Sequence, residues 1–328
     1  MIKLSLTLIS SVIVLLGNIQ NNFIPFSSPF LHAQEEQLQQ YSFTGKWDSK
    51  GSEDGQFKNP HSIDIDSNGN VFVADSGNNR IQKFSEAGKF ITKWGTEGTQ
   101  NGQFKGLHDV AADPSGKFVY TLELGNNHRI QKFTSDGEFI AKWTYENSGG
   151  AESYLDPHQI AIDSSGNLYL PDKGGSKVLK FDSNGNFVAK WGSEGTGNSQ
   201  FKTPHGAAID SKDNIYVTDM DNFRVQKFDS NGKFITKWGS EGSGEGQFSS
   251  VTPGIDVDPS DHVYVIDKEG ANIQEFDSNG NFVAKWGEEG DGDGEFSRPE
   301  DIAINPKTGR VYVTDTGNSR VEIFAVIK

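Results

Sequence analysis

The chain has 328 residues, among them 38 glycines and no cysteine, and a formal net charge of −15 at pH 7. The absence of cysteine excludes disulfides, thiolate metal sites and a cysteine nucleophile. The excess of acidic residues argues against a nucleic-acid partner, because contact with phosphates needs a basic surface that displaces counterions.

The first 33 residues differ in composition from the rest of the chain. Lys3 precedes an uncharged apolar run at 4–17. At about 14 residues this run is short for a membrane-spanning helix and typical of the hydrophobic region of a secretory signal. Ala33 ends a small-residue motif that suits cleavage before Gln34. We expect residues 1–33 to be a signal peptide or an N-terminal anchor and residues 34–40 to be a polar linker. The protein would be secreted, or anchored to the outer face of the cell membrane if the segment is retained.

Residues 41–328 repeat one unit, which the tryptophans mark most clearly. They recur at intervals of 47 to 49 residues, at Trp47, Trp94, Trp143, Trp191, Trp238 and Trp286. Each unit holds four short runs rich in Val, Ile, Tyr, Phe and Thr, with Asn, Asp, Gly and Ser between most of them. This pattern is typical of a four-stranded antiparallel meander. A period of this size with four strands per unit indicates a β-propeller, and six units predict six blades.

The two ends of the repeat region complement each other. The last repeat stops at Lys328 without the F-x-x-x-W strand that ends the others, and a matching segment, Tyr41–Trp47, precedes the first repeat. We therefore predict that this segment pairs beside Val321–Phe324 and completes the sixth blade. Such closure removes the open edges that a row of sheets would present. The prediction is an all-β, six-bladed, monomeric propeller over residues 41–328.

The repeated pattern P-x-x-I-A-[IV]-D, G-N-[IV]-Y-V-[TA]-D, N-x-R-[IV]-Q-K-F, G-x-F, K-W-G resembles the NHL repeat family. The resemblance extends from Tyr41 to the C-terminus and implies the same propeller fold. It does not imply one activity, because propellers host many functions. The links that differ most between units, 144–157 and 268–272, are the natural places for a function private to this chain.

One position of the repeat collects groups that bind metals. It lies five residues before the Asp or Asn that ends the first strand of each unit, and it holds His61, His108, His158, His205, Pro253 and Glu300. Because the first strand of each blade lines the channel, these residues should form a ring at one mouth. Imidazoles and a carboxylate in a narrow cavity are suitable ligands for Zn²⁺ or another divalent ion.

Six-fold geometry predicts which ligands act together. Alternate blades bring together His108, His205 and Glu300, which resemble catalytic ligand sets that leave positions open for water or substrate. His61 and His158 would assist from the neighbouring blades. The alternative is structural: duplication copied one histidine into several blades, where it only binds a channel water.

Three segments resemble the zinc-binding motif of the peptidyl-α-hydroxyglycine α-amidating lyases, NHL-like propellers that hold zinc through three histidines on alternate blades. These are Pro60-His61-Ser62, Pro157-His158-Gln159 and Pro204-His205-Gly206, and Leu107-His108-Asp109 is a near variant. The resemblance implies a zinc site. No alternate set here has three histidines, however, and the loops after the second strands lack the tyrosine that the lyase uses.

A second recurring pair consists of an acid and an arginine five residues apart. It occurs as Asp75/Arg80, Asp219/Arg224 and Asp315/Arg320. Because the pair recurs around the ring, we interpret it as a structural charge pair and not as part of a site.

Two functions from different classes follow. The first is a non-enzymatic binding or scaffold propeller for a peptide, protein or glycan partner. This function is compatible with a divalent metal such as zinc at the channel mouth but does not require one. The second is a metal-dependent lyase or hydrolase that works at the same mouth. The incomplete histidine sets and the missing tyrosine favour the first. The sequence identifies neither the partner, the substrate nor the metal.

Overall fold

The computed structural model describes residues 40–47, 49–125, 127–144 and 156–327. The predicted signal segment, the linker up to residue 39 and the variable link at 145–155 lie outside the described residues. Within them the helical segments are three single 3₁₀ turns, at Ser76–Asn78 (η1), Lys173–Gly175 (η3) and Met220–Asn222 (η4). In this part of the chain no helix is long and apolar enough to cross a membrane.

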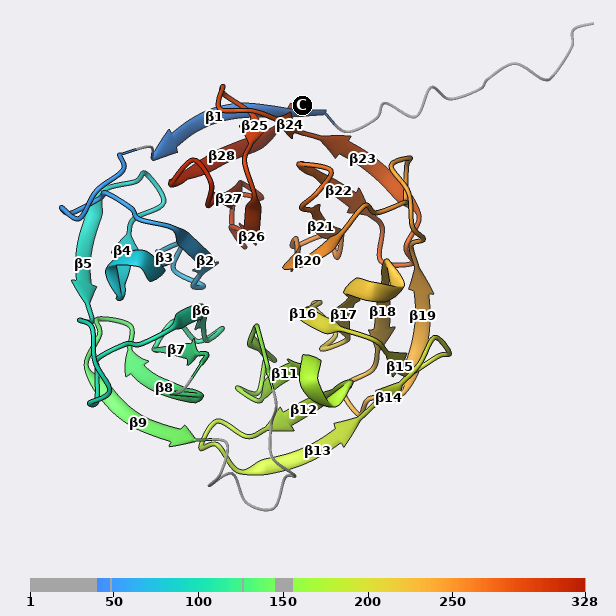
Figure 1. The fold of residues 1–328 in the computed structure, drawn as a ribbon, viewed down its shortest axis with the longest axis horizontal. Coiled ribbons are helices and arrows are strands. Elements are labelled where there is room, and N and C mark those ends of the chain that lie inside the picture. The colour runs from blue at the N-terminus through green and yellow to red at the C-terminus, as the bar shows by residue number, and fades with distance from the viewer. Residues whose placement is uncertain (1–39, 48, 126, 145–155, 328) are drawn as a thin grey trace, which may run out of the picture. The chain divides into compact units, whose positions relative to one another are not determined.

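The described residues form six antiparallel four-stranded sheets arranged as the blades of a propeller (Figure 1). The first strand of a blade lies nearest the axis and the fourth lies at the perimeter (Figure 1). The predicted fold class is therefore confirmed.

Blades one to three follow each other along the chain. Their strands are β2 (Pro60–Ile65), β3 (Val71–Asp75), β4 (Arg80–Phe84) and β5 (Phe90–Trp94); β6 (Leu107–Ala112), β7 (Phe118–Glu123), β8 (Arg129–Thr134) and β9 (Phe139–Thr144); and β10 (Ala161–Ile162), β11 (Leu168–Asp172), β12 (Lys177–Phe181) and β13 (Phe187–Trp191).

Blades four to six have the same order, except that the outer strand of blade six comes from the N-terminal end. Their strands are β16 (Pro204–Ile209), β17 (Ile215–Asp219), β18 (Arg224–Phe228) and β19 (Phe234–Trp238); β20 (Val251–Val257), β21 (Val263–Asp267), β22 (Asn272–Phe276) and β23 (Phe282–Trp286); and β26 (Pro299–Ile304), β27 (Val311–Asp315), β28 (Arg320–Ile327) and β1 (Gln40–Trp47). Two short parallel pairs lie in the links, β14 (Ser193–Glu194) with β15 (Gln200–Phe201) and β24 (Glu288–Glu289) with β25 (Glu295–Phe296).

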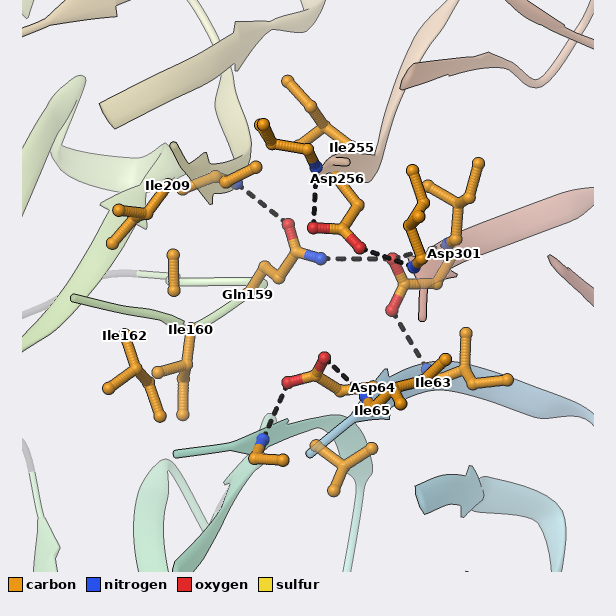
Figure 2. Close-up of a pocket in the computed structure, with 18 of the residues that line it drawn as sticks. Ile63, Asp64, Ile65, Gln159, Ile160, Ile162, Ile209, Ile255, Asp256 and Asp301 are labelled. Atoms are coloured by element: carbon orange, nitrogen blue, oxygen red, sulfur yellow. Dashed lines mark hydrogen bonds between the residues drawn. The ribbon is translucent and has the colours of Figure 1, made fainter. Parts of the chain in front are cut away.

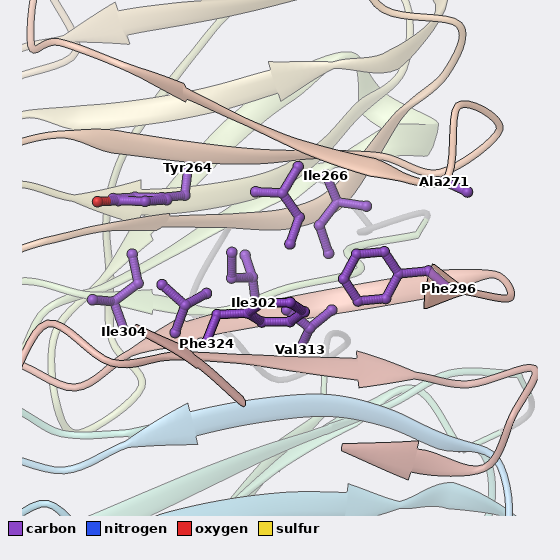
Figure 3. Packing of buried hydrophobic residues seen from close by; sticks show 10 residues of the cluster. Tyr264, Ile266, Ala271, Phe296, Ile302, Ile304, Val313 and Phe324 are labelled. Carbon is purple, nitrogen blue, oxygen red and sulfur yellow. The ribbon is translucent and has the colours of Figure 1, made fainter. Parts of the chain in front are cut away.

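The hydrophobic core consists of the contacts between neighbouring blades. Six clusters of buried residues line the ring, and each combines side chains from two adjacent blades. In the cluster of Figure 3, Tyr264 and Ile266 of blade five pack against Ile302, Ile304 and Phe324 of blade six. β-branched and aromatic side chains suit such a half-buried pleated surface, which explains their dominance in the strands.

The repeated tryptophans join the perimeter of one blade to a turn of the next. The Trp191 ring, for example, lies directly against Gly232 in the turn of blade four, so that a Cβ there would come within 2.6 Å of Cδ2 of the ring. Gly232 also has a φ of +80°, a conformation that disfavours other residues. Both the close approach and the backbone therefore require glycine at this position. Trp47, Trp94, Trp143 and Trp238 meet Gly88, Gly137, Gly185 and Gly280 in the same way.

Ring closure occurs as predicted, between β1 and β28. Phe43 pairs with Phe324 and Trp47 with Val321, in an antiparallel ladder interrupted by one irregularity before Gly45. The Tyr41 ring stacks on Trp286 of blade five at a centroid distance of 3.8 Å. Strand β1 thus contacts both of the last two blades.

The acid–arginine pairs are structural, as interpreted from their recurrence. Arg80 Nε donates to Asp75 Oδ2 at 2.7 Å, and both side chains are buried. The same guanidinium donates to three backbone carbonyl groups of the preceding link, those of Ser52, Glu53 and Gln56. Each arginine therefore fixes the link that enters its blade, and Arg224 and Arg320 repeat the arrangement.

Removal of residues 40–47 should expose the edge of β28 and cause self-association. The unpaired amide and carbonyl groups of an open edge recruit strands from other chains. A truncation that begins at residue 40 keeps β1 and serves as the control. Sedimentation velocity and thermal unfolding compare the two proteins. If the shorter one stays monomeric with an unchanged melting temperature, the closure seen between β1 and β28 contributes nothing to stability.

Candidate functional site

The predicted site residues stand at irregularities of the inner strands. Pro60 pairs with Asp75 and Ser62 with Ala74, so that His61 between them has no partner on β3. His108 and Glu300 occupy the same unpaired position in β6 and β26, and β16 is irregular at His205. A β-bulge of this kind redirects the side chain of the extra residue.

Four imidazoles from consecutive blades form a continuous row at this end of the channel. The ring centroids of His61 and His108 are 3.9 Å apart, those of His108 and His158 4.6 Å, and those of His158 and His205 4.2 Å. Contacts therefore run between neighbouring blades. We call the end of the channel formed by these four histidines and Glu300 the histidine mouth.

Hydrogen bonds in the row fix the tautomer of one imidazole. His108 Nδ1 lies 2.9 Å from the backbone oxygen of His158, which only accepts, so this nitrogen carries the hydrogen. His108 Nε2 then accepts from His158 Nδ1 at 3.2 Å. Both ring nitrogens of His108 are therefore engaged. His205 is only 8% exposed, and its Nδ1 has no hydrogen-bond partner among the described residues.

Enclosure at the mouth favours the neutral form of the imidazoles. Burial lowers the pKa of His61, His108, His158 and His205. The nearby ammonium group of Lys173 lowers the pKa of His158 and His205 further. Asp156 Oδ2 lies 3.1 Å from His158 Nε2 and acts in the opposite direction on the pKa, but burial outweighs it. Neutral imidazole is the form that binds metals and accepts hydrogen bonds.

Glu300 is buried and already has a cationic partner. Lys268 Nζ lies 2.5 Å from Glu300 Oε1, and the Arg298 guanidinium lies 3.6 Å from the same oxygen. The alternate set His108, His205 and Glu300 thus consists of one fully engaged imidazole, one free imidazole nitrogen and one paired carboxylate. In the described part of the chain, no group of three or more His, Asp or Glu side chains is placed to hold a metal ion.

Beneath the histidines the channel contains polar side chains that the sequence analysis missed. They lie on or directly before the inner strands, one and three residues beyond the histidine position, and comprise Ser62, Asp64, Asp109, Gln159, Asp256 and Asp301. The signal was present in the inner strand of two units, where an aspartate interrupts an apolar run, as in S-I-D-I-D and G-I-D-V-D.

These side chains join the blades at the axis. An inner strand pairs on one side only, and its free amides would otherwise lack partners. Asp64 accepts from the amide of Ala112 at 2.7 Å, and Asp109 from that of Ile160 at 2.7 Å. Three further side chains accept from a backbone amide of the next blade: Gln159 from Ala207 at 2.9 Å, Asp256 from Ile304 at 2.7 Å and Asp301 from Ile63 at 3.1 Å. Blade four has Gly206 and Ala208 at these positions and cannot form such a bond to blade five.

Burial in the channel raises the pKa of the channel carboxyls above the ordinary value for aspartate. Burial raises the pKa of Asp109 to about 6 and that of Asp256 to about 7. Burial and the charge of Asp256 raise the pKa of Asp64 well above its ordinary value, and burial and the charge of Asp109 do the same for Asp301. At neutral pH part of this group is therefore protonated.

Comparisons with known proteins agree with this architecture. The NHL repeat family model matches residues 57–84, 201–228 and 296–324. Each match begins at the buried aromatic residue before an inner strand and ends in the third strand of the blade. The chain is therefore a six-bladed propeller that carries NHL repeats. A comparison with curated proteins finds no significant match.

Solved structures with the same fold include proteins of several activities. A structural-genomics protein of unknown function from Bacteroides thetaiotaomicron has a TM-score of 0.63 at 17% identity, over 88% of this chain and 76% of its own. A catalytically inactive variant of virginiamycin B lyase from Staphylococcus aureus, solved with quinupristin, has a TM-score of 0.58 at 13% identity, over 88% and 100%. A gluconolactonase from Xanthomonas campestris has a TM-score of 0.59 at 12% identity, over 83% and 87%. At these identities the similarity shows the fold alone.

Replacement of Asp256 by asparagine should remove part of the pH dependence of stability. Because burial raises the pKa of Asp256 to about 7, the native state retains a proton that the unfolded chain, with a pKa near 4, has lost. The stability that this group contributes is complete at low pH and is lost as the pH rises through 7. Between pH 6 and pH 8 the parent should lose about 1 kcal/mol of unfolding free energy relative to Asp256→Asn.

Urea unfolding at the two pH values measures this difference. Asp182→Asn is the control: despite slight burial, hydrogen bonds from Asn186 and neighbouring amides lower the pKa of Asp182, which stays ionised throughout the range. A constant difference between Asp256→Asn and the parent would show that Asp256 does not titrate there.

Proposed function

We propose that the protein is an exported binding propeller whose ligand site is the histidine mouth, and that it engages a peptide, protein or glycan partner on this face. The observation that carries the proposal is the row of four imidazoles, with the buried, unpartnered Nδ1 of His205 at its end. A polar atom that is buried without a partner costs free energy, which a hydrogen bond from a ligand would recover.

Two cations beside the row support ligand recognition. Lys173 and Lys268 follow the second strands of blades three and five, and the charge of each lowers the pKa of His205. Lys268 is paired with Glu300, whereas Lys173 forms no ion pair with another described residue. Lys173 therefore offers a cationic donor to a partner, and His205 Nδ1 offers a second polar contact.

Binding explains this arrangement more simply than catalysis does. A catalytic base or nucleophile needs a free polar group within reach of the reacting atom. Glu300 is held by Lys268, and both nitrogens of His108 are engaged within the row. The groups of the mouth thus mostly bind one another and leave a few directed contacts for a ligand.

The double variant Lys173→Ala/His205→Ala tests the proposal. The parent, the double variant and Lys212→Ala are applied to arrays of immobilised peptides and glycans, and affinities for the retained probes are measured. Lys212 is exposed in the turn after β16, at the opposite end of the blade, and serves as the control. The double variant should bind about tenfold more weakly, which corresponds to about 1.4 kcal/mol. Equal affinity of all three proteins, or no retained probe, contradicts the proposal.

A metal-dependent lyase or hydrolase is the second candidate, and the neutral imidazoles favour it. His108, His205 and Glu300 would hold a Zn²⁺ ion, with His61 and His158 assisting, if Lys268 left Glu300 and His158 left His108. Such an ion would supply Lewis-acid chemistry at the mouth. A metal would also be compatible with the binding function.

Calorimetric titration with Zn²⁺ at neutral pH tests the metal site, with the parent compared to His108→Ala/His205→Ala. The parent should bind, and affinity should fall as the pH drops through the histidine range, near 6.5 for a free imidazole, because protonated imidazole does not bind metals. His262→Ala, which removes a histidine in the turn before β21, is the matched control. Equal binding by parent and double variant excludes the site, and no binding by the parent leaves the binding function without a metal.

A further inference from the structure

The channel contains a cavity of about 270 Å³ beneath the histidine mouth (Figure 2). Its lining begins one residue beyond the histidine position and extends to Ser67, Pro114 and Pro306, which follow the inner strands at the opposite end of the channel. None of the five residues of the histidine mouth lines it. The cavity is thus a separate place, and its volume lies near the lower end of the range for small-molecule pockets, about 300 to 1,000 Å³.

The wall of the cavity has two chemically different halves. Blades five, six, one and two each contribute one carboxylate, at Asp256, Asp301, Asp64 and Asp109. Blades three and four contribute mostly Ile and Ala side chains, with Gln159 as the polar exception. Figure 2 shows Asp64, Asp256 and Asp301 directed toward the centre, with Ile160, Ile162 and Ile209 on the other side.

The acidic half has no cation of its own. The described residues that line the cavity include no Lys, Arg or His. Each oxygen of Asp64 and of Asp256 accepts one backbone amide, at 2.7 Å in all four cases. A carboxylate oxygen can accept a second hydrogen bond, so both groups retain acceptor capacity toward the cavity. Neutral amides orient the charge but do not cancel it.

We propose that this cavity is a second ligand site and that it takes a small organic monocation, an apolar body with one ammonium group, whose ammonium lies between Asp64 and Asp256. The Ile and Ala side chains of blades three and four bury the apolar body, a contribution that grows with the area removed from water. The ammonium donates charge-assisted hydrogen bonds to the two carboxylates and supplies the cation that the wall lacks.

The same wall disfavours two other occupants. A divalent metal ion needs several ligands around one point, and no group of three acidic side chains in the described residues is so placed. A neutral apolar molecule would fill the volume but leave the repulsion between the carboxylates in place, the repulsion that raises the pKa of the buried Asp64 beyond the effect of burial alone. An organic monocation needs no group of three ligands around one point, and its charge offsets the repulsion between the carboxylates.

Benzylammonium and benzyl alcohol are the probes, because they share size and shape and differ in charge. Calorimetric titration of the parent at pH 8 should give an affinity for benzylammonium about tenfold or more above that for benzyl alcohol. Asp256→Asn should lose this preference, with Asp64→Asn as a second variant if the first does not fold. Asp182→Asn removes the same charge from an exposed turn and should bind like the parent.

Binding should also strengthen with pH. Asp256 gains charge as the pH rises through its pKa of about 7, so that affinity for benzylammonium should increase about tenfold from pH 6 to pH 8. The other titratable groups that act on this position are Asp64, Asp109 and Asp301 in the wall and Asp258 two residues further along the chain. All are carboxyls, so their ionisation changes affinity in the same direction.

Several results would overturn the proposal. Equal affinities for the amine and the alcohol would leave only an apolar hole, and binding of Na⁺, K⁺ or Ca²⁺ without the amine would make it an inorganic ion site. The Lys173→Ala/His205→Ala variant separates this site from the histidine mouth. It should bind benzylammonium like the parent, and a loss there would show that the amine binds at the mouth.

Discussion

The structure depends on one constraint: each blade has two apolar faces, and only the neighbouring blades can bury them. Every hydrophobic cluster combines residues from two blades, so no blade has a core of its own. Burial is complete only when the row of blades closes into a ring, because an end blade would leave one face in water. The tryptophan contacts at the perimeter and the carboxylate bonds at the axis reinforce the same interfaces from their two edges. The histidine mouth and the cavity beneath it exist because this packing places six inner strands around one axis.

The repeat allowed the architecture to be predicted from the sequence. The side chains of the channel could be predicted only in part. The spacing of the tryptophans and the matching segments at Tyr41–Trp47 and Val321–Phe324 specified the blades and their closure, since both follow from local pattern. The histidines could be placed at one mouth because they share a position in the repeat. Their mutual contacts could not be predicted, because those depend on the bulges that turn the side chains and on the channel width.

The carboxylates inside the channel were missed for a related reason. Sequence patterns show which side chains of a strand lie on each of its two faces. An inner strand also has an unpaired edge at the channel, and the backbone amides of that edge need acceptors that the pattern does not reveal.

The channel shows how one set of backbone positions acquires different chemistry along its length. At the mouth, burial lowers the pKa of the imidazoles; a few residues below, it raises the pKa of the carboxyls. In each case the enclosed site disfavours the charged form of the group. The two populations respond to pH in opposite directions. Neutral buried histidines favour folding at higher pH, and raised carboxyls favour it at lower pH. Both groups therefore contribute to the pH dependence of stability.

The pairing of β1 with β28 also determines when the protein can fold. β1 is the first strand of the propeller to be synthesised and β28 the last, and the two are separated by nearly the whole domain. Until β28 has left the ribosome, β1 has no partner strand and the ring stays open. The nascent chain therefore cannot bury itself blade by blade as a linear repeat protein can. Folding is therefore a property of the whole ring, and it depends on a late contact between two strands from opposite ends of the domain.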